Sequence, residues 1–259
     1  MKILIVGRTA TGKDRLAKAL SERGLKIVQS YTTREKRTPD EDTHTFITNE
    51  EAASYTDRVA ETVIGGTLYF ATRKQVEEGD VYIVDPKGFY DVTSNMPDTA
   101  FFLMYCSADP EESLLRALER SSDPQKAEEE WKKRTEAEAE EFFDFEKEIE
   151  SFASRNDFPK NCFQLYRWEN DFLGQEEIDR AADNVLYCVR EWRNMEKIVA
   201  TLKSQPDSMF DTDDEGRIIV YNKDYTFSAL PDDLFIGTVI VDAEGYKTIV
   251  SSYLRLHNI

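Results

Sequence analysis

Cysteine is scarce in this chain, which has three cysteines among 259 residues. Cys106, Cys162 and Cys188 lie far apart and form no C-x-x-C pair, so the sequence indicates neither a disulfide framework nor a zinc site. Long apolar runs are missing too, and the first expected strand begins at residue 2, which leaves no room for a signal peptide. We therefore expect a soluble protein of the cytoplasm that binds no membrane.

Positive charge is also in short supply. The 33 Lys and Arg residues are outnumbered by 51 Asp and Glu residues, and the net charge is −18. Because binding to a nucleic-acid backbone depends on basic patches, this balance argues against a general nucleic-acid-binding function. An anionic small substrate would need a local cluster of arginines. With 40% hydrophobic residues, the chain is long enough for one large domain and a small one.

A glycine-framed loop is the most informative feature near the start of the chain. Residues 2–14 read KILIVGRTATGKD, which is a strand over 3–6, the pattern G-x-x-x-x-G-K and then a helix over about 13–23. In such a loop the backbone N–H groups turn inward, the helix N-terminus adds partial positive charge and the lysine adds a point charge. The motif predicts binding of a nucleoside triphosphate by Gly7, Arg8, Thr9, Ala10, Thr11, Gly12 and Lys13.

Asp14 departs from this pattern. It stands where phosphate-loop enzymes carry the Ser or Thr whose hydroxyl ligates Mg²⁺. Its carboxylate could bind the ion directly or through water, since oxygen ligands suit magnesium. Alternatively, Asp14 only places a negative charge in the first helical turn, where the helix dipole favours it. The sequence leaves both readings open.

Strands alternate with helices up to about residue 204. The apolar runs 81–85 and 100–105 are typical of strands buried in a parallel sheet, and 25–28 is expected to be a further short strand. A hairpin with Gly65-Gly66 at its turn is expected within 58–69. The alternation predicts an α/β fold with a doubly wound parallel sheet. Helices are expected over 72–79, 109–119, 125–152 and 175–202.

The helix over 125–152 is rich in glutamates, Glu138 and Glu141 among them, which we interpret as a solvated face. An apolar stripe on the same helix begins at Phe142. The large domain is expected to end at residue 204, followed by an acidic connector over 205–216 and a small β-rich module over 217–259. A module of this size is marginal alone, so we expect it to pack on the main domain or on a second subunit.

Several separated motifs over about 1–197 resemble the guanylate kinase family of phosphate-loop nucleoside monophosphate kinases. The core of the resemblance is SYTTREKR over 30–37, followed by an acidic stretch and by His44. In the family this segment opens the acceptor-nucleotide subdomain, here about 30–80, and its two arginines, matched by Arg34 and Arg37, grip the monophosphate. Two guanidinium groups three residues apart can together bind the oxygens of one phosphate.

Further acceptor positions follow from the same resemblance. His44 stands where the family has a phosphate-binding tyrosine, and Tyr69 matches a second such tyrosine. Asp85 resembles an aspartate at the bottom of the site, where it would orient the acceptor or the hydrated Mg²⁺. Alternatively, His44 is an exposed loop histidine, Tyr69 is an aromatic residue of the core and Asp85 is a helix cap.

The lid of the family, here about 120–140, is flanked by arginines that Arg120 and Arg134 resemble. Such arginines would place positive charge around the transferring phosphoryl group, and lid closure would exclude water. Salt bridges to neighbouring glutamates are the alternative role. Asn170 resembles, loosely, the loop that contacts the donor adenine.

In the family, guanine is read by a serine, a glutamate and a second serine. Ser30 keeps the first. At the strict spacing of the glutamate the chain has Ala60, with Glu61 one position later, and Ala71 replaces the last serine, with Thr72 beside it. Since a lost hydrogen-bond partner forfeits discrimination, we expect a relaxed preference that includes deoxyribonucleoside monophosphates, with GMP and dGMP leading.

Together these motifs imply that the chain moves a phosphoryl group from ATP, with Mg²⁺, to a nucleoside 5′-monophosphate. Two alternatives stay open: a non-catalytic guanylate-kinase-like binding module, and a phosphate-loop kinase of a small non-nucleotide phosphate. The expected partners are the two nucleotides and no nucleic acid. The oligomeric state is open, with a homodimer among the alternatives.

Overall fold

The computed structural model describes residues 1–36, 39–150, 159, 161–170, 174–204, 209–212, 218–221, 239–241 and 247–249, with side chains described only up to residue 190 and not at 163 and 164. The chain divides into two compact units, Met1–Val185 and Leu186–Ile259. Each unit is described by itself.

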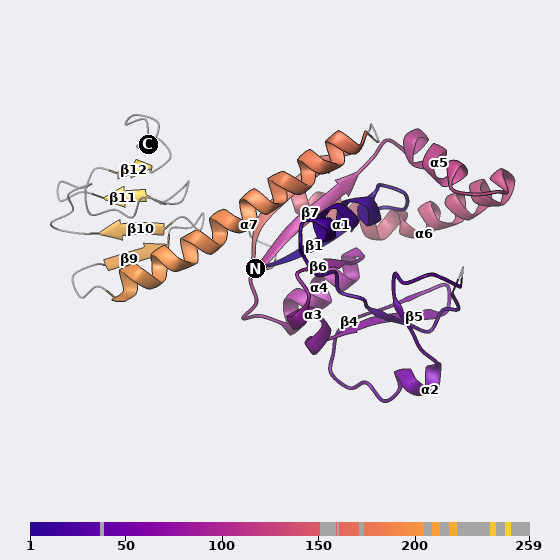
Figure 1. Ribbon diagram of the computed structural model, residues 1–259, viewed down its shortest axis with the longest axis horizontal. Coiled ribbons are helices and arrows are strands. Elements are labelled where there is room, and N and C mark those ends of the chain that lie inside the picture. The colour runs from indigo at the N-terminus through magenta and orange to yellow at the C-terminus, as the bar shows by residue number, and fades with distance from the viewer. Residues whose placement is uncertain are drawn as a thin grey trace. The chain divides into compact units, whose positions relative to one another are not determined.

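The first unit is built on a four-stranded parallel sheet with the order β6-β1-β7-β8. Figure 1 labels β6, β1 and β7 of this sheet. This is the mixed α/β architecture that the alternation of strands and helices predicts. The strand β8 is not among the predicted strands, because its run CFQLYRWE mixes polar and apolar residues. The strands are β1 (Lys2–Gly7), β6 (Val81–Ile83), β7 (Phe101–Ser107) and β8 (Cys162–Glu169).

Both faces of this sheet are covered. Along β1, Leu4 and Val6 point to one face and join a hydrophobic cluster with residues of α4 (Pro86–Asn95) and α6 (Pro124–Glu150). Ile3 and Ile5 point to the other face and are equally buried. The helix α1 (Lys13–Glu22), which packs against β1 and β6, buries four residues that lie outside the first cluster. Since each buried aliphatic side chain contributes about 1.5–3 kcal/mol, this core holds β1 and the loop that follows it in place.

A second sheet has the order β3-β2-β5-β4. Its strands β4 and β5 form the predicted hairpin, and Gly65 and Gly66 adopt the positive φ values of 58° and 81° that a tight two-residue turn requires. The strands are β2 (Tyr31–Thr32), β3 (Thr45–Phe46), β4 (Arg58–Ile64) and β5 (Thr67–Thr72).

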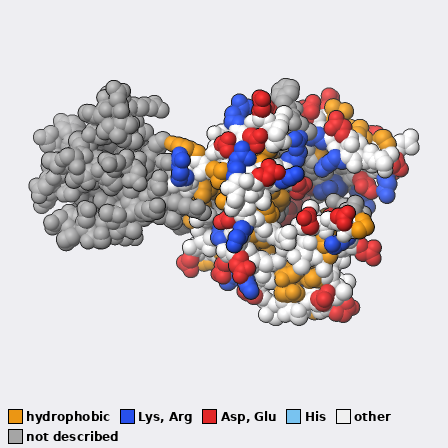
Figure 2. All heavy atoms as spheres, in the orientation of Figure 1, with side chains coloured by type: hydrophobic (Ala, Val, Ile, Leu, Met, Phe, Trp, Pro, Cys, Tyr) orange, Lys and Arg blue, Asp and Glu red, His pale blue; other side chains and the backbone are white. Residues whose placement is uncertain are grey.

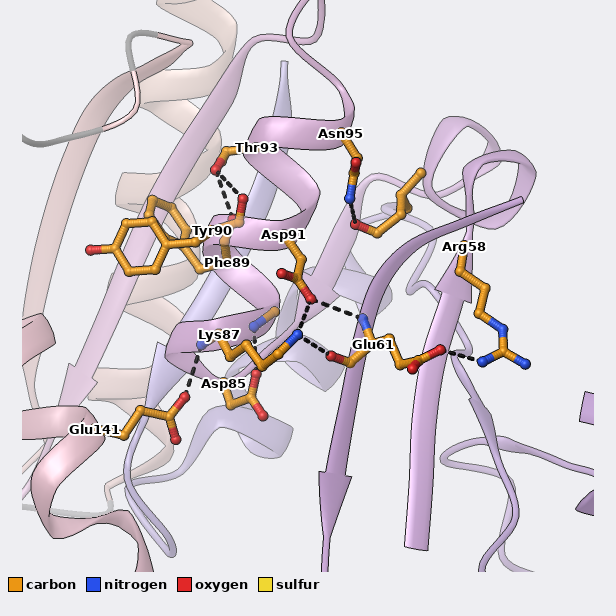
Figure 3. Close-up of polar contacts among 12 residues, drawn as sticks. Arg58, Glu61, Asp85, Lys87, Phe89, Tyr90, Asp91, Thr93, Asn95 and Glu141 are labelled. Carbon is orange, nitrogen blue, oxygen red and sulfur yellow. Dashed lines mark hydrogen bonds and ion pairs between the residues drawn. The ribbon is translucent and has the colours of Figure 1, made fainter. Parts of the chain in front are cut away.

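The helix α4 anchors the hairpin to the parallel sheet. Lys87 Nζ donates to the carbonyl of Glu61 at 2.7 Å, Asp91 accepts the Glu61 N–H at 3.2 Å, and Asn95 Nδ2 donates to the carbonyl of Val59 at 3.0 Å. These three side chains lie four residues apart on one face of α4, and Figure 3 shows them directed at the backbone of β4. This helix begins at Pro86 with Asp85 as its N-cap, which is the alternative role that the sequence allows for Asp85, although no helix is predicted over these residues.

The prediction of a strand over 25–28 is wrong. Only an isolated bridge between Ile27 and Val81 forms there, with Val28 N donating to Val81 O at 2.7 Å. The reason is that Leu25 N donates back to the carbonyl of Leu20, so the end of α1 takes up part of this short run. The helices over 13–23, 72–79, 109–119, 125–152 and 175–202 are confirmed within the described residues, with some ends shifted by a few residues, whereas residues 151 and 152 lie outside the described residues. Their bounds are α1 (Lys13–Glu22), α3 (Arg73–Glu78), α5 (Pro110–Glu119), α6 (Pro124–Glu150) and α7 (Gln175–Ser204), and a short α2 (Asn49–Ala52) precedes β4.

The second unit contains a four-stranded sheet with the order β12-β11-β10-β9. The central strands β10 and β11 are parallel and the outer pairings are antiparallel. The strand β9 lies within the range for which the sequence predicts a connector. The strands are β9 (Met209–Thr212), β10 (Ile218–Tyr221), β11 (Val239–Val241) and β12 (Lys247–Ile249).

Charged side chains of both signs lie next to one another on the face of the first unit that Figure 2 shows. The large negative net charge of the chain is therefore not gathered into one acidic surface on that face. Within the described residues, no helix combines the length and the apolar character that a membrane crossing requires.

Candidate functional site

The loop between β1 and α1 closes around the side chain of Lys13. Its Nζ donates to the carbonyls of Gly7 and Arg8, both at 2.6 Å. Burial lowers the pKa of this ammonium, while the carboxylates of Asp14 and Glu138 act in the opposite direction. The lysine therefore lies inside the curve of the loop, bonded to two of its carbonyls and with acidic groups nearby.

Two buried polar side chains, Asn170 and Arg116, hold the loop between β1 and α1 through hydrogen bonds. Asn170, which is completely buried, donates from Nδ2 to the carbonyl of Thr11 at 2.9 Å. The buried Arg116 donates to the carbonyl of Asn170 and, at 3.5 Å, to that of Ala10. A Cβ atom at Gly12, where φ is 93°, would lie 2.4 Å from Asn170 Nδ2. The side chain of Asn170, predicted to lie near the donor adenine, thus contacts the loop between β1 and α1.

Two glutamates of α6, Glu138 and Glu146, contact the same loop. Glu138 accepts hydrogen bonds from the N–H of Thr9 at 2.9 Å and from its hydroxyl at 2.5 Å. Glu146 accepts two hydrogen bonds from Arg8, at 2.9 and 3.0 Å, and a third from Tyr105. The interpretation of the glutamates as a purely solvated face is therefore wrong for Glu138, because its carboxylate points to the loop rather than to solvent.

The contacts of Glu146 lead to a prediction about acid stability. Burial favours the neutral acid, but the hydrogen bonds from Arg8 and Tyr105 outweigh burial and lower the pKa of Glu146 below its ordinary value. A carboxyl whose pKa is lower in the folded state stabilises that state above its unfolded pKa, and this contribution disappears as the pH falls through the folded pKa. We expect Glu146→Gln to destabilise the protein near pH 7, with the difference from the parent shrinking from about pH 5 downward. Urea unfolding of both proteins across this range measures the difference, and a constant difference would contradict the prediction.

The proposed magnesium residue lies in the first turn of α1, where the carboxylate of Asp14 is exposed. Among the described residues, no group of three or more acidic, His or Cys side chains is arranged to hold a metal ion. A single carboxylate suits Mg²⁺ bound mainly by nucleotide phosphates and water, which is the usual arrangement for this ion. Asp14 therefore fits the ion only together with a nucleotide.

The two predicted lid arginines are both exposed. Arg120 ends α5 and donates from Nε to the carbonyl of Arg116 at 3.0 Å. Arg134 lies on α6 with its Nη2 3.9 Å from the carboxylate of Glu138. Glu138 in turn binds Thr9, so Arg134 is connected to the loop between β1 and α1 through this glutamate.

The second sheet brings four predicted acceptor residues together. Arg34 donates to both carboxylate oxygens of Glu41, at 3.1 and 2.6 Å. Tyr69 lies close enough to Arg34 to raise its pKa, although Glu41 is the largest cause of that rise. The centroids of the Tyr69 and His44 rings lie 5.5 Å apart, and Ser30 Oγ lies 3.0 Å from His44 Nδ1. Arg37 lies outside the described residues.

Three other predicted acceptor residues have local partners instead. The carboxylate of Glu61 pairs with Arg58, and Figure 3 shows it directed away from Asp85. Asp85 accepts the N–H of Gly88 at 2.6 Å as the N-cap of α4. Thr72 is the N-cap of α3, in a reciprocal arrangement with Gln75. Each of these polar groups is therefore bonded to a nearby residue of its own segment.

Sequence reasoning does not identify Glu138 and Glu146 as part of the site. One available signal is the spacing of Arg134, Glu138, Phe142 and Glu146, which lie four residues apart and share one face of a helix. This spacing does not point to the loop between β1 and α1 until the helix is placed.

Comparison with solved structures finds distant similarity. The chain is similar to a guanylate kinase from Anaplasma phagocytophilum, with 15% identity, a TM-score of 0.38 and coverage of 73% of this chain and 84% of that one. It is also similar to an uncharacterized protein from Eubacterium ventriosum, with 14% identity, a TM-score of 0.36 and coverage of 73% and 99%. No protein-family model and no curated protein matches the chain.

Proposed function

We propose that this protein is a kinase that transfers the γ-phosphoryl group of ATP to a nucleoside 5′-monophosphate. The supporting observation is the phosphate loop: the Thr9 N–H already holds an anionic oxygen, that of Glu138, and Lys13 lies within the curve of the loop. A loop that presents N–H donors and a lysine at a helix N-terminus suits the donor phosphates. When bound, Mg²⁺ would supply positive charge to those phosphates, and Asp14 would hold it.

The acceptor phosphate would bind at Arg34, with Arg37, His44 and Tyr69 around it. Arg34 already holds a carboxylate, that of Glu41, in a two-point contact, which a phosphate would replace with a similar geometry. Arg120 and Arg134 would add positive charge around the transferred group. No strong base is required, because the attacking phosphate is anionic at neutral pH, so catalysis rests on positioning and charge.

The preference of this kinase for a base is proposed to be relaxed. Glu61 is bound to Arg58 and Thr72 caps α3, so two groups that would read a guanine edge already have partners. A base edge that finds fewer partners is discriminated less strongly. GMP and dGMP remain the leading acceptors in this proposal, with other deoxyribonucleoside monophosphates accepted at lower efficiency.

A coupled assay of ADP formation against the common ribo- and deoxyribonucleoside monophosphates tests the proposal. Turnover with at least one of them supports it. If ATP binds but every monophosphate fails, a kinase of a small non-nucleotide phosphate is favoured, and if ATP does not bind, a non-catalytic module is favoured. A GMP preference of about a thousandfold or more, roughly 4 kcal/mol, would contradict the relaxed specificity.

The acceptor role of Arg34 predicts a selective kinetic defect. We expect Arg34→Ala to raise the acceptor KM by about tenfold or more and to leave the ATP KM within about twofold, since the variant loses a charge-assisted contact to the monophosphate alone. Arg73→Ala, whose partly exposed side chain lies at the start of α3, is the matched control and should change neither constant. Equal rises in both KM values for Arg34→Ala would mean that this arginine does not form the acceptor site.

A further inference from the structure

One face of α6 is directed at the phosphate loop. Arg134, Glu138, Phe142 and Glu146 lie four residues apart and so share that face. The contacts agree with this placement: Glu138 binds Thr9, the Phe142 ring lies 5.1 Å from the guanidinium carbon of Arg8, and Glu146 binds Arg8. The helix therefore meets the loop along two turns.

The two glutamates of this face differ in what they occupy. Glu146 binds the side chain of Arg8, outside the backbone cradle, and is held there by Tyr105 as well. Glu138 instead binds the N–H of Thr9, a backbone donor of the cradle, together with the Thr9 hydroxyl. An anionic oxygen at this N–H has the chemistry of a phosphate oxygen at a phosphate loop.

We propose that Glu138 is an internal competitor for the donor phosphates. Its carboxylate occupies the Thr9 donors while no nucleotide is bound, and the triphosphate of the donor displaces it. This inference rests on the proposed function, because it takes the loop to be the triphosphate site. Two anions cannot share these donors, since charge repulsion adds to the loss of the hydrogen bonds.

Displacement of Glu138 has a consequence for α6. Arg134 lies 3.9 Å from the Glu138 carboxylate, so removal of that carboxylate from the loop also removes this acidic neighbour of Arg134. The pairing of Glu146 with Arg8 does not involve the cradle and can persist. Arrival of the donor would thereby change the position of Glu138 while the far end of the helix stays attached, and would leave Arg134 available to phosphate.

Calorimetric titration of the full chain with Mg²⁺–ATP and, separately, with inorganic tripolyphosphate tests the inference. We expect Glu138→Ala and Glu138→Gln to bind both ligands about tenfold more tightly than the parent, a gain of roughly 1.4 kcal/mol. Glu140→Gln removes the same charge from an exposed position two residues away and should bind within about twofold of the parent. The glutamine variant keeps the size of the side chain, so it provides the test if the alanine variant fails to fold.

Amide hydrogen exchange provides a second readout, which a purely structural role of Glu138 would not change. In the parent, tripolyphosphate should increase exchange in the part of α6 around Glu138, and in Glu138→Ala the same ligand should have little effect there. Unchanged or weaker binding of tripolyphosphate by both Glu138 variants would overturn the inference, even if ATP is still turned over. Tighter tripolyphosphate binding without turnover of any monophosphate would support the competitor and contradict the proposed kinase.

Discussion

Lys13→Ala is expected to abolish phosphoryl transfer while leaving the fold intact. The lysine is the positive charge inside the loop, and its loss should raise the reaction barrier by on the order of 3 kcal/mol, which corresponds to a rate reduction of more than a hundredfold. The structure adds a second cost, because Nζ also holds the carbonyls of Gly7 and Arg8. We therefore expect weaker ATP binding in addition to slower turnover.

The fold should tolerate this change, since the buried ammonium carries a desolvation cost that offsets its hydrogen bonds. Lys18→Ala is the control: this lysine lies on the same helix, is largely exposed and pairs only weakly with Glu22. Steady-state rates of ADP formation and thermal unfolding of both variants measure the effects. Activity of Lys13→Ala within a few-fold of the parent at saturating ATP would remove the loop from the mechanism.

Gly12→Ala is expected to damage both the loop and the binding of ATP. At φ 93° an alanine is strained by about 1 kcal/mol, and its Cβ would lie 2.4 Å from Asn170 Nδ2. Because Asn170 is fully buried and bonded to Thr11, it cannot move aside without losing that hydrogen bond. We expect ATP affinity to fall by about tenfold or more, since the loop backbone must shift.

Gly24→Ala separates the effect of backbone strain from the effect of the clash with Asn170. Gly24 has nearly the same φ, 92°, but a Cβ there would meet no atom within 4 Å. This control should lose about 1 kcal/mol of unfolding free energy and no ATP affinity. In an Asn170→Ala background the extra penalty of Gly12→Ala should shrink, as a double-mutant cycle of urea unfolding and ATP titration would show. A penalty that is the same in both backgrounds would mean that Asn170 does not constrain Gly12.

Local patterns account for the parts of the fold that the sequence predicts well. The Gly65-Gly66 turn and the strand–loop–helix over residues 2–22 depend on neighbouring residues, because glycine torsions and helix periodicity are properties of short segments. The strand β8 depends instead on pairing with β7, a partner far away in the sequence. Its mixed composition therefore gives no clear local signal.

The candidate site divides in the same way. The sequence by itself determined that Gly7, Gly12 and Lys13 lie in a glycine-framed loop between a strand and a helix N-terminus, because that motif is contained in a few consecutive residues. Only the tertiary structure decided that Asn170 binds this loop at Thr11 and Glu138 binds it at Thr9, since these contacts join residues 159 and 129 positions apart. The physical reason is that a hydrogen bond between distant segments depends on where the core packs their helices and strands, and spacing along the chain does not encode that packing.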